Sequence, residues 1–435
     1  MAGVTVHNGI SAAGLLFFIG FLILFSRSKR NISFRVIIWG IALQILFALF
    51  VFLVPFGAKF FLILNDVTMQ IIEGAFEGIR FLFGPLAQSP GRPGSIGFIL
   101  AFQALPSIIF FAALMELLYY VGIMERLIAL FARIFTKVMG ISGAESLCAS
   151  AQIFLGIESN LTIRPYLKEM TVSELMVVLT TGMATIASSV LGFYVIILSG
   201  VFPTVAGHLI SASILLAPAA IIAAKIIFPE TGSPMTRGKV VSVEYEKAGN
   251  PIEAIINGSM TGVKMVVGIA ALLIAFIGLV AVFDSGLAYL GKVIGSASGR
   301  TIDLTLNTIL GYVFYPFTVA MGVPLEDAPQ IARILGERII MTEVKSYQDL
   351  STLVQAGKIV HSRSVFIATY TLCGFAHIPS LAIFVGGTST LIPERTKEIA
   401  VIGLWALFAA NIACFMTGAL AGIFYTGQGG ILIRP

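Results

Sequence analysis

The longest uncharged stretch of the chain restricts its possible folds more than any other feature. Between Glu174 and Lys225 there is no aspartate, glutamate, lysine or arginine. Soluble domains carry about 25% charged residues, whereas this chain of 435 residues carries 11%. A transmembrane helix needs about 20 predominantly apolar residues, so this stretch is long enough for two crossings. The sequence therefore predicts an all-α integral membrane protein that crosses the bilayer many times.

Apolar runs predict about eight transmembrane helices. The candidates are Gly9–Phe25, Val36–Pro55, Ile96–Ile123, Leu175–Ser199, His208–Phe228, Met265–Phe283, Ser364–Leu391 and Ile399–Ile423. The first apolar run has no basic region before it and no clear cleavage site, which favours a span over a removable signal. The loop that follows, SRSKRNISFR, contains cations and no acid, which indicates the cytoplasmic side. We expect a multi-pass protein of the cell inner membrane with its N-terminus outside.

The remaining composition argues against other classes of function. The cysteines Cys148, Cys373 and Cys414 are far apart and match no zinc or redox spacing. The net charge of +5 arises from cations in short loops, where they set membrane topology rather than bind nucleic acid. We therefore expect no cofactor and no nucleic-acid partner.

Two parts of the chain resemble each other and divide it. FTKVMG at 135–140 corresponds to FTVAMG at 317–322, and acids follow each copy shortly afterwards. In each half a mixed polar segment and an interrupted span come next. The expected organisation is a scaffold with an interfacial helix (1–94), a first repeat (95–228; hairpin 140–168, unwound span 172–199), a cytoplasmic loop (229–257) and a second repeat (258–435; hairpin 322–361, unwound span 363–391).

Counting loops makes the two copies cross the membrane in opposite directions. Inverted repeats, with substrate and ion sites near the midplane where broken helices meet, are typical of secondary transporters. The hairpins are expected to be re-entrant, since non-helical backbone at membrane depth is tolerated only where protein or water covers it.

Each hairpin has an acid at its expected tip. Intramembrane acids are functional by default, which makes Glu158 and Glu343 candidate site residues. The alternative for Glu158 is an ion pair with Arg164 that merely closes the hairpin. The alternative for Glu343 is a surface position beside Lys345.

The interrupted spans offer further candidates. In MATIASSVLG (183–192), hydroxyl groups such as that of Thr185 can replace backbone partners where the helix opens, although Ser and Thr also mediate helix contacts. In GFAHIPSLA (374–382), Pro379 removes a backbone donor and breaks the helix. His377 and Ser380 then lie beside freed carbonyl groups.

At these residues the chain resembles the concentrative nucleoside transporter family over nearly its full length. The stretches that carry the resemblance are SIGFILAFQALPSIIFFAALMELLYYVGIM (95–124), GAESLCASAQIFLG (143–156), MTVSELM (170–176) and CGFAHIPSLAIFVGG (373–387). The resemblance implies eight spans, interfacial helices and two re-entrant hairpins, assembled as a homotrimer in the lipid bilayer. It also implies that a nucleoside is held between the hairpins and the unwound helices.

The resemblance implies two sets of site residues. The substrate-binding set is Glu158, Ser159, Val190, Glu343, Phe375, His377 and Ser380. The coupling-ion set, a possible Na+ site, comprises the side chains of Gln152 and Thr185 and the carbonyls of Leu155 and Ile186.

Several positions depart from the family pattern. The base-reading glutamine of the first hairpin is lost at Ile157 or at a gap, His377 replaces a ribose-binding asparagine, and Gln152 replaces an asparagine of the sodium site. Either sodium or a proton is therefore a candidate coupling ion, the proton being carried by Glu158, Glu343 or His377.

The expected function is cation-coupled import of nucleosides by alternating access. An importer of a related modified nucleoside or nucleobase is the alternative within transport. A membrane-embedded enzyme using the acids and His377 for acid–base catalysis is the remote one, since the chain has no HExxH or Gly-x-Ser-x-Gly motif.

Overall fold

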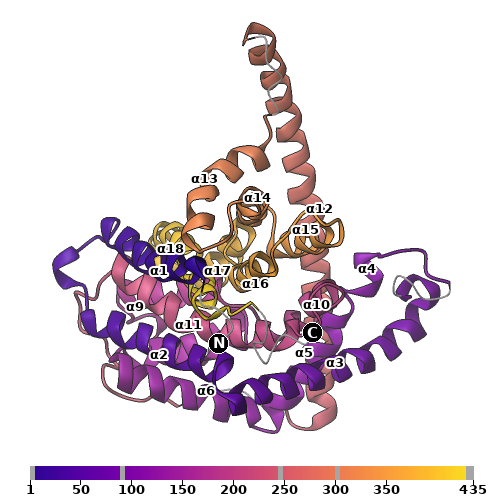
Figure 1. Ribbon diagram of the computed structural model, residues 1–435. Helices are drawn as coiled ribbons and strands as arrows, with labels where there is room; N and C mark the ends of the chain where they lie inside the picture. Colours follow the sequence, from indigo (N-terminus) through magenta and orange to yellow (C-terminus); the bar gives the residue numbers. More distant parts are fainter. Residues whose placement is uncertain (1–4, 89–93, 243–247, 299–303, 428–435) are drawn as a thin grey trace.

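The computed structural model describes residues 5–88, 94–242, 248–298 and 304–427, and these residues form helices and connecting turns without a strand (Figure 1). The α-helices are α1 Val6–Leu24, α2 Phe34–Phe52, α3 Pro55–Phe83, α4 Leu100–Gln103, α5 Ser107–Tyr120, α6 Ile123–Ile134, α7 Gly143–Ala151, α8 Arg164–Leu167, α9 Val172–Ala184, α10 Ser188–Leu198, α11 Val205–Ile227, α12 Pro251–Ser298, α13 Leu306–Ala320, α14 Ala328–Ile340, α15 Glu343–Gln355, α16 Ser362–Leu372, α17 Ile378–Leu391 and α18 Thr396–Phe424. Short 3-10 helices are η1 Lys29–Asn31, η2 Gly84–Ala87, η4 Ile157–Ile163 and η5 Pro393–Arg395, and η3 Phe135–Met139 is a π-helical turn.

The described residues include 7 helices or helix pairs that are long and apolar enough to cross a membrane. They correspond to seven of the expected spans. The eighth, expected at Ser364–Leu391, consists of the two shorter helices α16 and α17. The chain is therefore a multi-pass membrane protein. Within the scaffold segment 1–94, which is expected to include an interfacial helix, α3 is the α-helix that is not among the candidate spans.

Helix α12 is longer than the sequence predicts. The expected span was Met265–Phe283, but the helix has 48 residues and begins at Pro251, inside the segment expected to be a loop. Pro251 suits the first helical position, and the Asn250 side chain accepts a hydrogen bond from the Glu253 amide at 2.9 Å, which caps the helix start. At 1.5 Å per residue α12 is about 72 Å long. It projects well beyond the other helices in Figure 1.

Both expected hairpins are present as helix–turn–helix segments. In the first, α7 leads to a turn at residues 152–156, and the chain returns through η4 and α8. In the second, α14 and α15 are joined at Met341 and Thr342. The first hairpin starts with a capping box, in which Ser142 and Glu145 each bond the other's backbone amide. Such reciprocal capping stabilises a short helix that has few turns of its own.

Both expected helix breaks are also present. Helix α9 ends at Ala184 and α10 begins at Ser188. The Ser188 amide donates to the Phe154 carbonyl of the first hairpin at 2.8 Å, which satisfies a donor that an intact helix would have used internally. The second break separates α16 from α17, and Pro379 lies in the first turn of α17, where its missing amide proton has no cost.

The start of the first span, α1, lies on the same side as the end of the last span, α18. The Asn8 side chain donates to the carbonyl of Tyr425, just after α18, at 2.8 Å. The base of the second hairpin lies on this side too, because Arg363 donates to the carbonyls of Gly322 at 2.8 Å and His7 at 2.9 Å. An even number of crossings requires the start of α1 and the end of α18 to lie on one side.

The base of the first hairpin lies at the other end of α1. Glu145 pairs with Lys225 in the last turn of α11 at 2.7 Å. The Ile227 carbonyl of that same turn accepts from the Arg27 amide, just after α1, at 2.9 Å. The two hairpins therefore enter the helix bundle from opposite sides, as an inverted repeat requires.

Candidate functional site

The two helix breaks lie against each other in the protein interior. Gly374, in the second break, approaches the Ala184 carbonyl at the end of α9 so closely that a Cβ atom would clash with it. Gly182 of α9 likewise leaves no room for a Cβ atom against the Phe384 ring of α17. Small residues let helix backbones approach closely in membranes. The breaks of the two repeats therefore form one shared polar region.

Glu343 is buried at this region, where its side chain contacts both repeats. The Tyr194 hydroxyl, from α10 of the first repeat, donates to Glu343 Oε1. The Nε2 atom of His377, from the second break, lies 2.6 Å from Glu343 Oε2. Because Glu343 is only 3% exposed, the expected alternative of a surface acid beside Lys345 does not hold.

His377 caps helix α17, and this capping contact orients the His377 imidazole ring toward Glu343. Its Nδ1 atom accepts a hydrogen bond from the Ser380 amide at 3.1 Å. An accepting Nδ1 carries no proton, so the ring proton is assigned to Nε2, which faces the carboxylate. The Ser380 hydroxyl is used locally, since it donates toward the carbonyls of Phe375 and His377. The Phe375 ring lies edge-on to the His377 ring with centroids 6.0 Å apart.

Glu158 lies on the first hairpin, at the start of η4, and is half-buried. Arg164 is exposed, and no ion pair joins it to Glu158 in the described part of the chain. The expected alternative, in which these two residues pair to close the hairpin, is not supported. Ser159 and Val190 are buried near the same hairpin and break.

Each hairpin contacts the broken helix of the other repeat. The second hairpin does so through Glu343 and Tyr194, and the first through Asn160, whose Nδ2 atom donates to Thr388 Oγ1 of α17 at 2.8 Å. Ile157 also packs against Gly387, where a Cβ atom would clash. Four of the predicted site residues are in contact through His377, namely Glu343, Phe375, His377 and Ser380. Glu158 lies apart from this group, on the other hairpin.

The oxygen atoms at the first break are compatible with a bound sodium ion. The Leu155 and Ile186 carbonyls accept no hydrogen bond from any described residue. Thr185 donates its hydroxyl proton to the Thr181 carbonyl at 2.8 Å and keeps its lone pairs. The Gln152 amide is oriented by α9, because Nε2 donates to the Val178 carbonyl at 3.0 Å and Oε1 accepts from Thr181. Hard alkali cations prefer such uncharged oxygen ligands.

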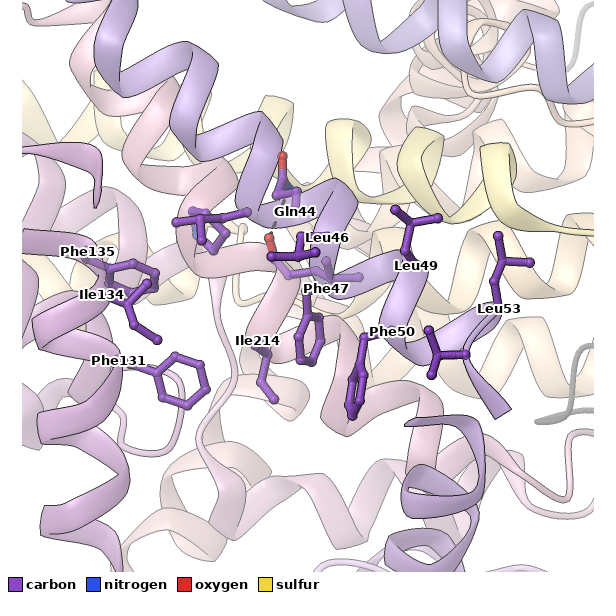
Figure 2. Close-up of a pocket in the computed structure, with 14 residues that line it drawn as sticks. Gln44, Leu46, Phe47, Leu49, Phe50, Leu53, Phe131, Ile134, Phe135 and Ile214 are labelled. Atoms are coloured by element: carbon purple, nitrogen blue, oxygen red, sulfur yellow. Dashed lines mark hydrogen bonds between the residues drawn. The ribbon is translucent and has the colours of Figure 1, made fainter. Parts of the chain in front are cut away.

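A large hollow lies elsewhere, between α2, α6 and α11, and has a volume of about 670 Å³. Figure 2 shows the rings of Phe47, Phe50 and Phe131 around it, together with Ile214. The amide of Gln44 is its main polar group, and it donates to the Leu215 carbonyl at 3.0 Å. The hollow includes neither Glu158 nor Glu343. Because its lining is apolar apart from Gln44, it suits hydrocarbon rather than a polar solute.

Several polar residues around the two hairpins and the two helix breaks were not predicted from the sequence. They are Tyr194, Asn160, Thr181, Arg338 and Asn411. Tyr194 lies in the apolar run LGFYVIIL, so the sequence predicts a position in the hydrophobic core. Its polar tip is evident only from the fold, although a buried tyrosine hydroxyl usually has a partner.

Two hairpins that enter from opposite sides, with two broken helices meeting between them, define the class of secondary transporters with a midplane site. Family sequence models narrow this class. They match "Na+ dependent nucleoside transporter N-terminus" over residues 13–86, "Nucleoside recognition" over 101–201 and "Na+ dependent nucleoside transporter C-terminus" over 208–422. The chain belongs to the concentrative, Na+-dependent nucleoside transporter family, whose members are transporters rather than enzymes.

Relatives agree with this assignment. The chain is 35% identical to an "Uncharacterized transporter" of Haemophilus influenzae over 418 residues, covering 95% of this chain and 97% of that one. It is 35% identical to human "Solute carrier family 28 member 3" over 428 residues, covering 95% of this chain but only 59% of the human protein. The structure of CNTnw in an inward-facing substrate-bound state matches with a TM-score of 0.86 and 33% identity, covering 97% and 98% of the two chains.

Proposed function

We propose that the protein is a cation-coupled importer of nucleosides, working by alternating access around the region between the two hairpins and the two breaks. The observation that carries this proposal is the buried Glu343 carboxylate, held by Tyr194 and His377 where the repeats meet. The family assignment supports the solute class. We assign the solute site and its moving parts to the repeats 95–228 and 258–435, and a scaffold role to residues 1–94.

Glu343 is suited to bind the hydroxyl groups of a sugar. A carboxylate has about four lone-pair sites, and Tyr194 and His377 use only one on each oxygen. Vicinal hydroxyls can donate to the remaining sites. Hydrogen bonds to charged groups contribute about 1.5–3 kcal/mol each, so this contact alone discriminates strongly against solutes that lack hydroxyl groups.

Base recognition is expected to be permissive. Glu158 can accept from a base N–H group, and its neighbour Ile157 is apolar where a base-reading amide would be needed for bidentate contact. Loss of a bidentate contact costs about 1–3 kcal/mol of discrimination. We therefore expect purine and pyrimidine nucleosides to compete with each other for transport.

A sodium ion would be held by Gln152 Oε1, Thr185 Oγ1 and the carbonyls of Leu155 and Ile186. It would supply positive charge to carbonyl groups that the break of α9 leaves without partners. A proton is the second candidate, with Glu158 as carrier. His377 is a poor carrier, because a second ring proton on Nδ1 would displace the Ser380 amide.

Uptake of labelled uridine and adenosine into proteoliposomes tests the proposal, with sodium and proton gradients imposed separately. We expect accumulation that depends on one of the two gradients. No gradient-dependent accumulation of any nucleoside would reject the function. Competition by free ribose or by free base distinguishes a nucleoside importer from an importer of a nucleobase.

We also propose a homotrimer in the cell inner membrane, with the N-terminus outside. Helix α12 supports assembly, since apolar side chains such as Ile274, Leu279 and Val282 are exposed along it. Large exposed apolar surfaces usually face lipid or another protein chain. Mass measurement of the purified protein in detergent tests the number of copies.

A further inference from the structure

Arg338, on α14 of the second hairpin, is a buried cation without a carboxylate partner. It is 0% exposed and is the largest fully buried side chain among the residues that the structure describes. In the described part of the chain, no aspartate or glutamate forms an ion pair with it. Buried charges are normally paired with an opposite charge, because burying one alone is costly. Arg338 therefore requires another source of negative potential.

The end of helix α16 supplies that potential. Nη1 of Arg338 donates to the Thr371 carbonyl at 2.5 Å, in the last turn of α16. The last carbonyls of a helix have no partner within the helix and carry the negative end of its dipole. The guanidinium group thus binds where the second break exposes carbonyl groups.

Asn411 of α18 extends this contact across the break. Nη2 of Arg338 donates to Asn411 Oδ1 at 2.6 Å. Asn411 Nδ2 in turn donates to the Ala376 carbonyl at 3.1 Å and to the Leu407 carbonyl at 3.0 Å. A continuous series of hydrogen bonds through Arg338 and Asn411 therefore connects Thr371, before the break, to Ala376, the residue next to His377.

We propose that the Arg338 guanidinium is the resident cation of the second break, that is, a permanently held positive charge. Arg338 is a positioning residue that fixes the backbone presenting His377 to Glu343. The first hairpin provides a contrast, because the side chain that bonds its neighbouring broken helix is the neutral amide of Gln152. It follows that the second break needs no free ion to stabilise its carbonyl groups. The positioning role rests on the proposed function.

Chemical rescue tests the proposal. Arg338→Ala removes the cation and leaves a space that free guanidinium can occupy. We expect the KM for uridine, normalised to folded protein, to rise about 100-fold, as for loss of a buried charge partner. Millimolar guanidinium should lower this KM and raise the thermal unfolding temperature of the variant, and the same concentration of urea should do neither. Arg333→Ala, at an exposed position of the same helix, is the matched control.

An Arg338→Ala variant that is folded with an unchanged KM, or whose defect guanidinium does not relieve, contradicts the proposal. If this variant does not fold, Arg338→Lys and Arg338→Met test whether the positive charge is needed, because lysine and methionine differ in charge but are similar in length. Uridine binding by the lysine variant alone supports a resident cation, and equal behaviour of the two variants overturns it. The guanidinium effect on unfolding is measured without solute, so it remains informative if the protein transports no nucleoside.

Discussion

Glu343 is held from two sides, by the Tyr194 hydroxyl and by Nε2 of His377. The second contact exists because Nδ1 of His377 is occupied by the Ser380 amide, which directs the other ring nitrogen to the carboxylate. At the scale of residues, the proposed site is therefore preorganised by helix capping, because His377 and Ser380, which cap α17, are also proposed binding residues.

Glu343→Gln is expected to reduce uptake at least about 100-fold while the protein remains folded, because an amide cannot accept from Tyr194, His377 and a sugar together. Initial rates in proteoliposomes measure the effect, with expression and monodispersity as checks. Glu326→Gln, at an exposed position at the base of the same hairpin, is the control. Loss of folded protein instead of loss of transport would assign Glu343 a structural role.

Glu158→Gln is likewise expected to abolish uptake without loss of the folded protein, since a half-buried intramembrane acid is retained for function rather than stability. Arg164→Gln serves as the matched variant. Because the two residues make no ion pair in the described structure, Arg164→Gln should transport normally. Equal defects in both variants would show that they act as a pair.

Tyr194→Phe removes one donor to Glu343 and no apolar surface. The KM for nucleosides is expected to rise about tenfold, the value of one hydrogen bond to a charged group, with little change in the maximal rate. Concentration-dependent uptake measures it, and Tyr289→Phe on the exposed part of α12 is the control. An unchanged KM would mean that Tyr194 does not act on the binding residues.

At the scale of elements, the sequence predicts the breaks well and the helix lengths poorly. Pro379 and Gly374 mark the second break, and the hairpin acids mark the tips. By contrast, hydropathy detects only the apolar centre of α12, and the helix continues through polar turns at both ends. The 3-10 return limb of the first hairpin carries no sequence signal of its own. Arg338 was missed because its segment is already rich in charge.

Helix α12 packs on α5 through glycines. A Cβ atom on Gly258 would lie 2.6 Å from the Ala112 carbonyl, whereas Gly268 of the same helix has nothing within 4 Å. Gly258→Ala is expected to lower stability by about 1–3 kcal/mol through overpacking. Gly268→Ala should be neutral or slightly stabilising, since alanine favours helix. Thermal unfolding in detergent compares them, and equal unfolding temperatures would contradict this packing.

At the scale of the whole molecule, the two repeats bind each other crosswise. The first hairpin contacts α17 through Asn160 and Thr388, and the second contacts α10 through Glu343 and Tyr194. Glu343 contacts His377 of the second break, and the first hairpin, which carries Glu158, contacts the first break through Phe154 and Ser188. The inverted order was predictable from loop charge and a short internal match, but the crosswise contacts join residues far apart in the sequence and required the fold.

The central claim is that one polar solute is held between the acids of the two hairpins, away from lipid. A cryo-electron microscopy map of the protein in lipid nanodiscs with uridine tests it most directly. The expected map shows the nucleoside beside the two breaks, with its sugar at Glu343 and its base toward Glu158. Density for uridine elsewhere, or either acid among the lipid headgroups with no cavity joining the two, would contradict the claim.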